Sequence, residues 1–286
     1  MFTIGKRLRS LGLVLTIGAV AIVSSSFVPF PGQVGAGPTD PTTTSSTIAP
    51  TTTTTVPSKV AHADLHGRFT VLEIGDSLGI DLGWGLGVEV TPTKSPKVTV
   101  IQAAKGSTGL SNDWYFSWPA NFSTLLHRTA PQVAIVLLGT NDEQSIRVGT
   151  TICAFNTSCW RAAYSGRVRQ MLNLARLTHT QVIWVAALPM GAPAFNQAMV
   201  AINAVTRPIV TSSSNGTFFE TSPLFTSVHG VYRSAAIVNR QLQAIREPDG
   251  IHINLLGSDC LAFSIIKSLK TTFGVPITPA LPLLVQ

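Results

Sequence analysis

The sequence predicts an α/β domain built around a parallel sheet, and three observations lead to this prediction. Short apolar, β-branched runs alternate with amphipathic helical stretches from residue 69 onward. The run at 133–138, Val-Ala-Ile-Val-Leu-Leu, is apolar at every position, which is typical of a strand buried on both faces. The connections between these segments are short. We therefore expect a parallel sheet covered by helices on both faces.

The expected elements follow one another in strict alternation. The five strands are short and rich in apolar residues, and they lie at 69–74, 97–103, 133–138, 182–187 and 217–220. The helices show apolar periodicity near 3.6 residues, and they lie at 78–88, 119–129, 160–178, 193–210 and 254–272. Glycines at 83, 85 and 87 weaken the first helix, and we expect them to permit close packing or a bend. The stretch 221–247 is left open as a lid, a substrate wall or an irregular connection.

The N-terminus predicts export of this domain. Residues 1–10 form a short basic segment, and residues 11–30 carry no charge. Twenty apolar-biased residues can cross a hydrocarbon core of about 30 Å, and the preceding cations favour a cytoplasmic N-terminus. An uncleaved membrane anchor is preferred to a cleaved signal peptide, because the run is long and no clear small-x-small site ends it. A buried core helix is the third alternative. The first two give a single-pass membrane protein with an extracytoplasmic domain, or a secreted protein.

We expect residues 31–66 to form a disordered linker and residues 67–286 to form the folded, monomeric domain. The linker is dominated by Thr, Pro and Ser, which cannot bury enough apolar surface to offset chain entropy. We interpret it as a stalk. His62 and His66 at its end lack a third ligand, so no metal site is expected there.

Charge and cysteine usage exclude several function classes. The net charge is +7, but the basic residues are scattered and form no stripe of the kind that binds nucleic acid. Cys153 and Cys159 bracket a short loop and favour a local disulfide in an oxidising compartment, whereas Cys260 is expected to be a buried thiol. No C-x-x-C or G-x-G-x-x-G pattern is present, and no metal or organic cofactor is predicted.

Four polar or glycine-rich segments are predicted at one rim of the sheet, where ligands of open parallel sheets bind. Three of them follow strands and one precedes the last helix: Gly75-Asp-Ser-Leu78, Lys105-Gly-Ser-Thr-Gly-Leu110, Gly139-Thr-Asn-Asp142 and Asp249-Gly-Ile-His252.

These segments hold the residue types that nucleophilic catalysis needs. Ser77 follows a strand and opens a helix, so its hydroxyl is exposed and its N–H can face a developing oxyanion. A serine needs a base, which His252 can supply, and the base needs an orienting carboxylate, which Asp249 can supply from three residues away. Asn141 and Gly109 are placed to complete an oxyanion hole, with Gly106 as the alternative to Gly109. Asp76 is expected to have a structural role.

At these residues the chain resembles the SGNH hydrolases, also called GDSL esterases and lipases. Gly-Asp-Ser-Leu matches the segment that names the family, Gly-Thr-Asn-Asp matches its asparagine segment, and Asp-Gly-Ile-His matches its Asp-x-x-His segment. The stretch from 107 to 119 is similar to a bacterial, envelope-anchored branch. The resemblance spans about 69–273 and implies a flavodoxin-like three-layer fold.

The resemblance also implies a function. Ser77 would be the nucleophile, His252 the base and Asp249 its partner, with the N–H groups of Ser77 and Gly109 and the amide of Asn141 as the oxyanion hole. We therefore expect a carboxylic-ester hydrolase acting outside the cytoplasm on an acylated small molecule, glycan or lipid. An acyltransferase with the same residues and a non-catalytic envelope-binding protein remain alternatives. The aromatic cluster at 114–118 is expected either to contact substrate or to fix its loop to the core.

Overall fold

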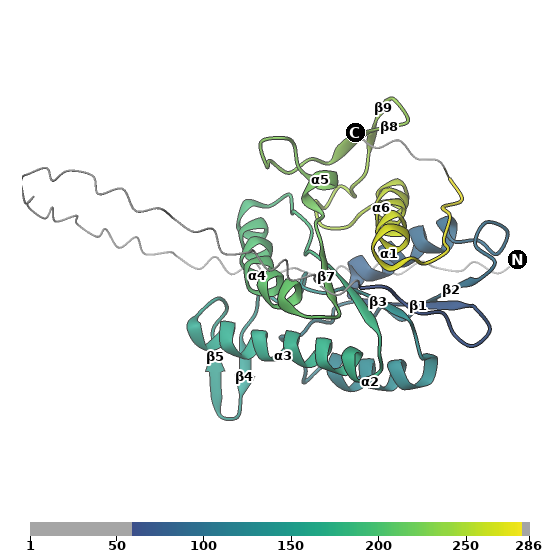
Figure 1. Ribbon diagram of the computed structural model, residues 1–286. Coiled ribbons are helices and arrows are strands. Elements are labelled where there is room, and N and C mark those ends of the chain that lie inside the picture. Colours follow the sequence, from purple (N-terminus) through teal and green to yellow (C-terminus); the bar gives the residue numbers. More distant parts are fainter. Residues whose placement is uncertain (1–58, 282–286) are drawn as a thin grey trace, which may run out of the picture. The chain divides into compact units, whose positions relative to one another are not determined.

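The computed structural model describes residues 59–281, and these form one sheet with helices on both faces (Figure 1). The sheet has five strands in the order β2-β1-β3-β6-β7, and all four pairings are parallel. Its strands are β1 (Phe69–Gly75), β2 (Val98–Gln102), β3 (Val133–Leu137), β6 (Gln181–Val185) and β7 (Gly216–Phe219). The predicted parallel sheet of five strands is therefore confirmed.

Strands β1 and β3 form the middle of the sheet. Leu72 lies between Ile101 of β2 and Ala134 of β3. Every residue of β3 is buried, as its continuous apolar run predicts. Because all five strands are parallel, their carboxyl ends lie at one rim, and the loops that leave them meet there.

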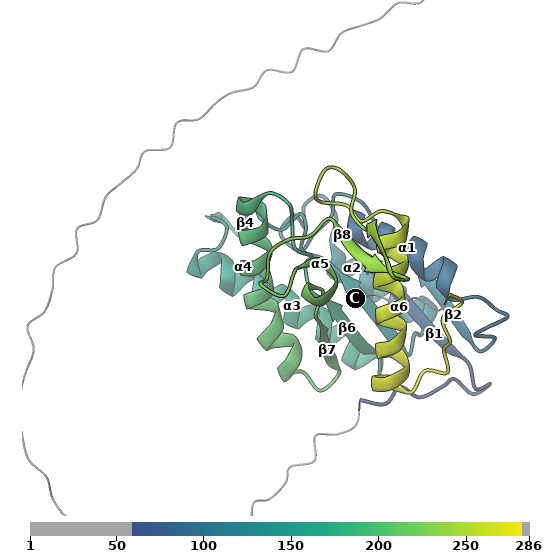
Figure 2. The same cartoon turned by 90° about the horizontal axis from the view of Figure 1, so that it is seen from above.

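Five long helices make the outer layers (Figures 1 and 2). Helices α1 (Ser77–Glu89) and α6 (Leu255–Phe273) pack together on one face. Helices α2 (Trp118–Thr129), α3 (Ser158–Leu177) and α4 (Pro193–Ser212) cover the other face. This is the placement that right-handed crossovers give for the observed strand order. The expected three-layer α/β/α architecture is confirmed.

Gly85 explains why the glycine-rich helix α1 packs so closely on α6. A β-carbon at this position would lie 2.2 Å from the backbone oxygen of Ser258. Any larger residue would push the two helices apart. The prediction that the glycines of this helix permit close packing is thus confirmed at Gly85.

Two small hairpins and one short helix were not predicted. Hairpin β4–β5 (Ile146–Val148 and Thr151–Cys153) follows β3, and hairpin β8–β9 (Ala235–Val238 and Gln241–Ala244) lies within the stretch 221–247 together with α5 (Ser222–Phe225). Cys153 at the end of β5 is disulfide-bonded to Cys159, and Cys260 is a buried thiol, as the sequence predicts.

The folded domain begins earlier than predicted. The side chain of Ala61 is buried, and its N–H donates to the carbonyl of Phe273 at 3.0 Å. Residues 59–66 are therefore part of the domain, because a small apolar residue there covers the end of α6. The rest of the predicted linker and the predicted anchor at 11–30 lie outside the described residues. Within residues 59–281, no helix is both long enough and apolar enough to cross a membrane.

Candidate active site

The turn between β1 and α1 presents Ser77 at the carboxyl end of the sheet. Asp76 is the N-cap of α1, and its Oδ1 accepts the N–H of Leu78 at 2.9 Å. Ser77 is therefore the first residue of the helix rather than its cap. Its hydroxyl remains available for another partner, and its N–H lies at a helix N-terminus, where partial positive charge favours an anion.

The turn before α6 supplies that partner. The Nε2 atom of His252 lies 3.0 Å from the Oγ of Ser77, and its Nδ1 lies 2.7 Å from the Oδ2 of Asp249. The other carboxylate oxygen of Asp249 accepts the N–H groups of Ile251 and His252 at 2.8 and 3.0 Å. The structure thus brings all three predicted residues into one hydrogen-bonded chain.

Asp249 is held as an anion. Partial burial opposes ionisation, but the hydrogen bonds from His252 and from two backbone N–H groups outweigh it and lower the pKa of Asp249 to about 2. An ionised carboxylate on Nδ1 fixes the tautomer of the ring, so that Nε2 is free to accept a proton from Ser77.

Arg246 and Asp81 fasten this turn to its surroundings, and sequence reasoning missed both. The buried guanidinium of Arg246 donates to the carbonyl of Pro189 at 2.8 Å. Asp81, one helical turn after Ser77, accepts the N–H of Ile253 at 3.3 Å. Asp81 therefore ties the helix that carries Ser77 to the turn that carries His252. The only signal in the sequence was its spacing of four residues from Ser77, which places both on one helix face.

Asn141 lies at the same rim and bridges two loops. Its Nδ2 donates to the carbonyl of Thr108 at 3.0 Å, which joins the loop after β3 to the loop after β2. An amide nitrogen carries two hydrogens, so one remains for a ligand.

The two candidate glycines have different surroundings. Gly109 is buried, and a β-carbon there would lie 2.3 Å from Oδ1 of Asp142. Gly106 is half-buried, and a β-carbon there would lie 3.8 Å from the side chain of Ile80 on α1. The preceding residue, Lys105, donates its N–H to the carbonyl of Gly75 at 2.8 Å. Gly106 is therefore the residue after a hydrogen bond between its loop and the end of β1, the strand that precedes Ser77.

A buried polar network supports the loops from below. Asp76 accepts the N–H of Thr140 at 3.1 Å, which ties the Ser77 turn to the Asn141 loop. Asp142 accepts the N–H of Ser111 at 2.6 Å and the hydroxyl of Tyr164 at 2.8 Å. Burial, reinforced by the negative charge of Asp142, raises the pKa of Asp76 to about 7. The structural role expected for Asp76 is confirmed, whereas the contribution of Tyr164 was not predicted.

The aromatic cluster divides into two parts. Trp118 is fully buried, and its Nε1 donates to the hydroxyl of Thr108 at 2.9 Å. Phe116 packs edge-on against Trp118. Trp114 and Tyr115, in contrast, are 82% and 48% exposed. Trp118 and Phe116 thus fix the loop to the core, whereas substrate contact by the exposed Trp114 and Tyr115 stays a prediction.

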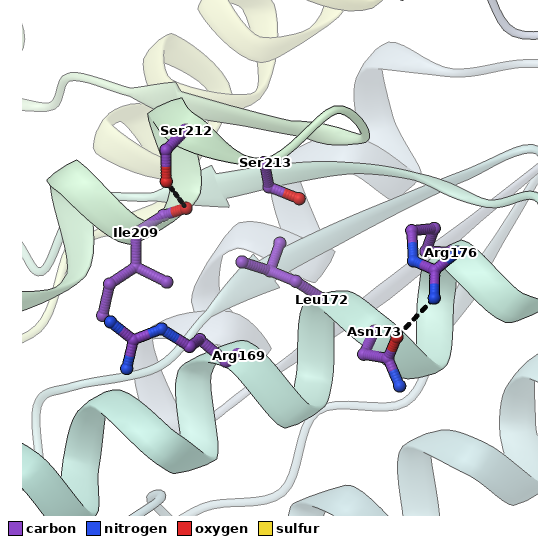
Figure 3. Close-up of a pocket in the computed structure, with 7 residues that line it drawn as sticks. All are labelled: Arg169, Leu172, Asn173, Arg176, Ile209, Ser212 and Ser213. Carbon is purple, nitrogen blue, oxygen red and sulfur yellow. Dashed lines mark hydrogen bonds between the residues drawn. The ribbon is translucent and has the colours of Figure 1, made fainter.

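Some pockets lie away from Ser77. One of them, of about 230 Å³, lies between α3 and α4 just before β6 and β7 and thus at the opposite rim, and Figure 3 shows its lining residues. Its side chains largely bond to each other or to nearby backbone; it is lined by Arg169, Leu172, Asn173, Arg176, Ile209, Ser212 and Ser213. In the part of the chain that the structure describes, no group of three or more His, Cys, Asp or Glu residues could hold a metal ion.

A family model described as "Protein of unknown function (DUF459)" matches residues 70–268. This match covers more than half of the chain and includes every candidate site residue. The comparison with curated proteins gave no significant match.

Solved structures with the same arrangement include LAE5, described as an α/β hydrolase enzyme from the metagenome of Lake Arreo, Spain. It has a TM-score of 0.50 and 14% identity, over 70% of this chain and 94% of that chain. Axe2, an acetylxylan esterase from Geobacillus stearothermophilus, has a TM-score of 0.47 and 14% identity over the same shares. A protein from Desulfitobacterium hafniense DCB-2, described as lipolytic and of the G-D-S-L family, has a TM-score of 0.47 and 13% identity, over 69% and 98%. The likeness to LAE5 agrees with the predicted α/β fold, and at 14% identity it shows the fold alone.

Proposed function

We propose that this chain, which belongs to the DUF459 family, is a serine-dependent carboxylic-ester hydrolase, because it joins Ser77, His252 and Asp249 in one hydrogen-bonded chain. The observation that carries the proposal is this chain of bonds, 3.0 Å from serine to histidine and 2.7 Å from histidine to aspartate. Nucleophile, base and orienting carboxylate are within bonding reach before any substrate binds.

The reaction follows from this geometry. His252 Nε2 takes the proton of Ser77 as Oγ attacks the ester carbonyl, and the ionised Asp249 stabilises the imidazolium that forms. Collapse of the tetrahedral intermediate breaks the bond to the alcohol, which leaves with the proton from His252. Water, deprotonated by the same histidine, then attacks the acyl-enzyme and releases the acid.

Three donors stabilise the oxyanion in this proposal. The N–H of Ser77 and the free amide hydrogen of Asn141 supply two of them. For the third we favour Gly106 over Gly109, because Gly109 is buried against Asp142 while Gly106 is half-buried beside the helix that starts at Ser77.

We also propose that the enzyme works outside the cytoplasm, on an acylated glycan or lipid of the cell envelope. Two observations support this location. The uncharged run at 11–30 has the length of a membrane anchor, and Cys153 and Cys159 form a disulfide, which is typical of oxidising compartments.

The test is hydrolysis of p-nitrophenyl acetate and butyrate by the full chain, compared with Ser77→Ala and His252→Ala. We expect turnover in the parent protein and its loss in both variants, with unchanged melting temperatures. Equal rates in all three proteins would overturn the assignment of these residues. Mass analysis of the products separates hydrolysis, which gives the free acid, from acyl transfer, which gives an acylated acceptor.

A further inference from the structure

A second cavity, of about 610 Å³, lies between the loop after β2 and the hairpin β4–β5. We call it the Trp114 pocket; it is lined by Asp113, Trp114, Ser145, Arg147, Gly149 and Ile152. Its volume falls in the range of small-ligand sites. None of these residues belongs to the hydrogen-bonded chain at Ser77, so the pocket needs its own explanation.

The walls of the pocket expose large apolar side chains to solvent. Trp114, in the loop after β2, is 82% exposed, and Ile152, in strand β5, is 62% exposed. Two residues further along, Phe116 is half-buried against Trp118, the fully buried first residue of α2. The exposed indole of Trp114 is not packed in the core. It presents a flat apolar face with a polar edge, on which a sugar ring can stack.

Both walls are held rigidly. Arg167 of α3 forms an ion pair with Asp113 at 2.9 Å and also bonds to the carbonyl of Leu110. On the other side, the disulfide between Cys153 and Cys159 ties the end of the hairpin to the start of α3, and the indole of Trp160 donates to the carbonyl of Gln144 at 2.8 Å. A pocket whose walls are already fixed binds its ligand at a lower entropic cost.

The charges of the pocket favour an anionic ligand. The carboxylate of Asp113 is already paired with Arg167. Arg147 is exposed at the start of the hairpin, and within residues 59–281 it has no ion-pair partner. A guanidinium presents a planar fork of donors that matches a carboxylate. The combination of a charged fork, a hydroxyl at Ser145 and an indole face suits a carboxylated sugar better than an acyl chain.

Both walls of the pocket are linked to the loop that carries Asn141. The hairpin begins at Ile146, five residues after Asn141, and Gln144 bonds to the carbonyl of Asn141. The opposite wall, Asp113 and Trp114, follows the glycine-rich loop that accepts the bond from Asn141. A chain-like substrate with its ester at Ser77 could therefore extend along these two loops.

We propose that the Trp114 pocket binds a carboxylated sugar unit of the ester substrate, with the sugar ring against Trp114 and the carboxylate on Arg147. This inference rests on the proposed esterase function, since it names the class of alcohol from which the acyl group is removed. It adds a substrate class, an acidic glycan, to the reaction described above.

The test measures binding separately from turnover. The full chain carrying Ser77→Ala is titrated by calorimetry with tetragalacturonate and with an alginate tetrasaccharide, and maltotetraose serves as the neutral probe. We expect the carboxylated probes to bind at least about tenfold more tightly than the neutral one, and added salt to weaken them. Trp114→Ala and Arg147→Gln should each weaken this binding by about tenfold or more.

Matched controls change the same residue types elsewhere. Trp84→Ala removes another exposed tryptophan, on α1, and Arg128→Gln removes an exposed arginine on α2. Both should leave binding unchanged. Absent binding of both carboxylated probes, or equal binding of neutral and carboxylated probes in all variants, would overturn the proposal. So would sedimentation with phosphatidylglycerol vesicles that depends on Trp114, since this would indicate a membrane contact instead.

Turnover of p-nitrophenyl acetate separates the two proposals. The four pocket and control variants, made in the parent protein, should hydrolyse this small ester at the parent rate, because it does not reach the pocket. Sugar binding without any ester turnover would refute the esterase but not the pocket. Ester turnover without sugar binding would refute the pocket alone.

Discussion

The two turns that meet at the candidate active site are built in opposite ways. The turn that carries Ser77 rests on Asp76, which is fully buried and accepts backbone N–H groups from helix α1 and from the loop after β3. The turn that carries His252 lies at the surface, where the side chains of His252 and Asp249 are 37% and 44% exposed. The Ser77 turn is therefore part of the core, whereas the His252 turn packs on the core with its side chains at the surface.

The carboxylates of the two turns show the physical consequence. Burial raises the pKa of Asp76 to about 7, whereas hydrogen bonds to Asp249 outweigh its slight burial and lower its pKa to about 2. The buried carboxylate of Asp76 holds backbone N–H groups in place. The exposed, ionised carboxylate of Asp249 can stabilise the imidazolium that His252 forms during the reaction. We therefore expect substitution of Asp76 to change stability and substitution of Asp249 to change rate.

The largest effect is expected for Asp249→Asn. The amide oxygen can still accept the backbone N–H groups, but it no longer fixes the histidine tautomer, so kcat for p-nitrophenyl acetate should fall by about 10²–10⁴-fold. The melting temperature should stay within about 2 °C of the parent value, since the side chain is exposed. Glu247→Gln, a neighbouring exposed carboxylate, is the matched control and should keep the parent rate. A large loss of stability in Asp249→Asn would contradict the contrast between the turns.

Asn141→Ala tests the loop that faces both turns. Removal of one oxyanion donor typically lowers kcat by about 10²–10³-fold with little change in KM. Steady-state kinetics on the same ester would show this split. Gln144→Ala, which removes an amide that bonds to the backbone of Asn141, is the control and should lower kcat less than Asn141→Ala. If the control lowered kcat equally, the effect would reflect loop position rather than a lost donor.

Asp76→Ala tests whether the Ser77 turn depends on its buried carboxylate for stability. Two N–H groups, those of Leu78 and Thr140, would lose their buried acceptor, and each such loss costs about 1–3 kcal/mol of unfolding free energy. Urea denaturation of the variant should show a midpoint well below that of the parent. Asp76→Asn keeps one acceptor oxygen and should lie between the two. Unchanged midpoints in both variants would mean that the Ser77 turn does not depend on this carboxylate.

The smallest effect is expected for Glu73→Gln on β1. Both carboxylate oxygens of Glu73 are buried and have no hydrogen-bond partner in the described part of the chain, and burial raises its pKa well above the usual value. The folded state then keeps a proton that the unfolded state loses above its ordinary pKa. Stability from this group is therefore full below about pH 4 and falls as pH rises. Melting temperatures of parent and variant should be similar near about pH 4, and the variant should be the more stable near about pH 8. A pH-independent difference would contradict this account.

The elements and the triad segments could be predicted because they depend on local patterns. The continuous apolar run at 133–138 and the helical periodicity at 160–178 both predicted their elements to within a few residues. The segments around Ser77 and His252 could be placed at one rim because parallel strands end on the same side of a sheet.

What the sequence did not reveal depends on contacts between distant segments. Tyr164 bonds to Asp142 across 22 residues, and Arg246 reaches Pro189 across 57. Nothing in the pattern of α3 distinguishes Tyr164 from any other core residue of a helix. The strands of β4–β5 and β8–β9 are only three or four residues long, too short to show alternation. Burial of Ala61 against the end of α6 likewise has no local signal.

The central claim is that Ser77 is an activated nucleophile, and covalent labelling tests it most directly. The full chain is treated with a fluorophosphonate probe, digested, and the labelled peptide is identified by mass spectrometry. We expect a single label on Ser77, strong reduction of labelling in His252→Ala and in Asp249→Asn, and parent-level labelling in Glu247→Gln. An unlabelled Ser77 in the folded parent protein, or labelling that persists in His252→Ala, would contradict it.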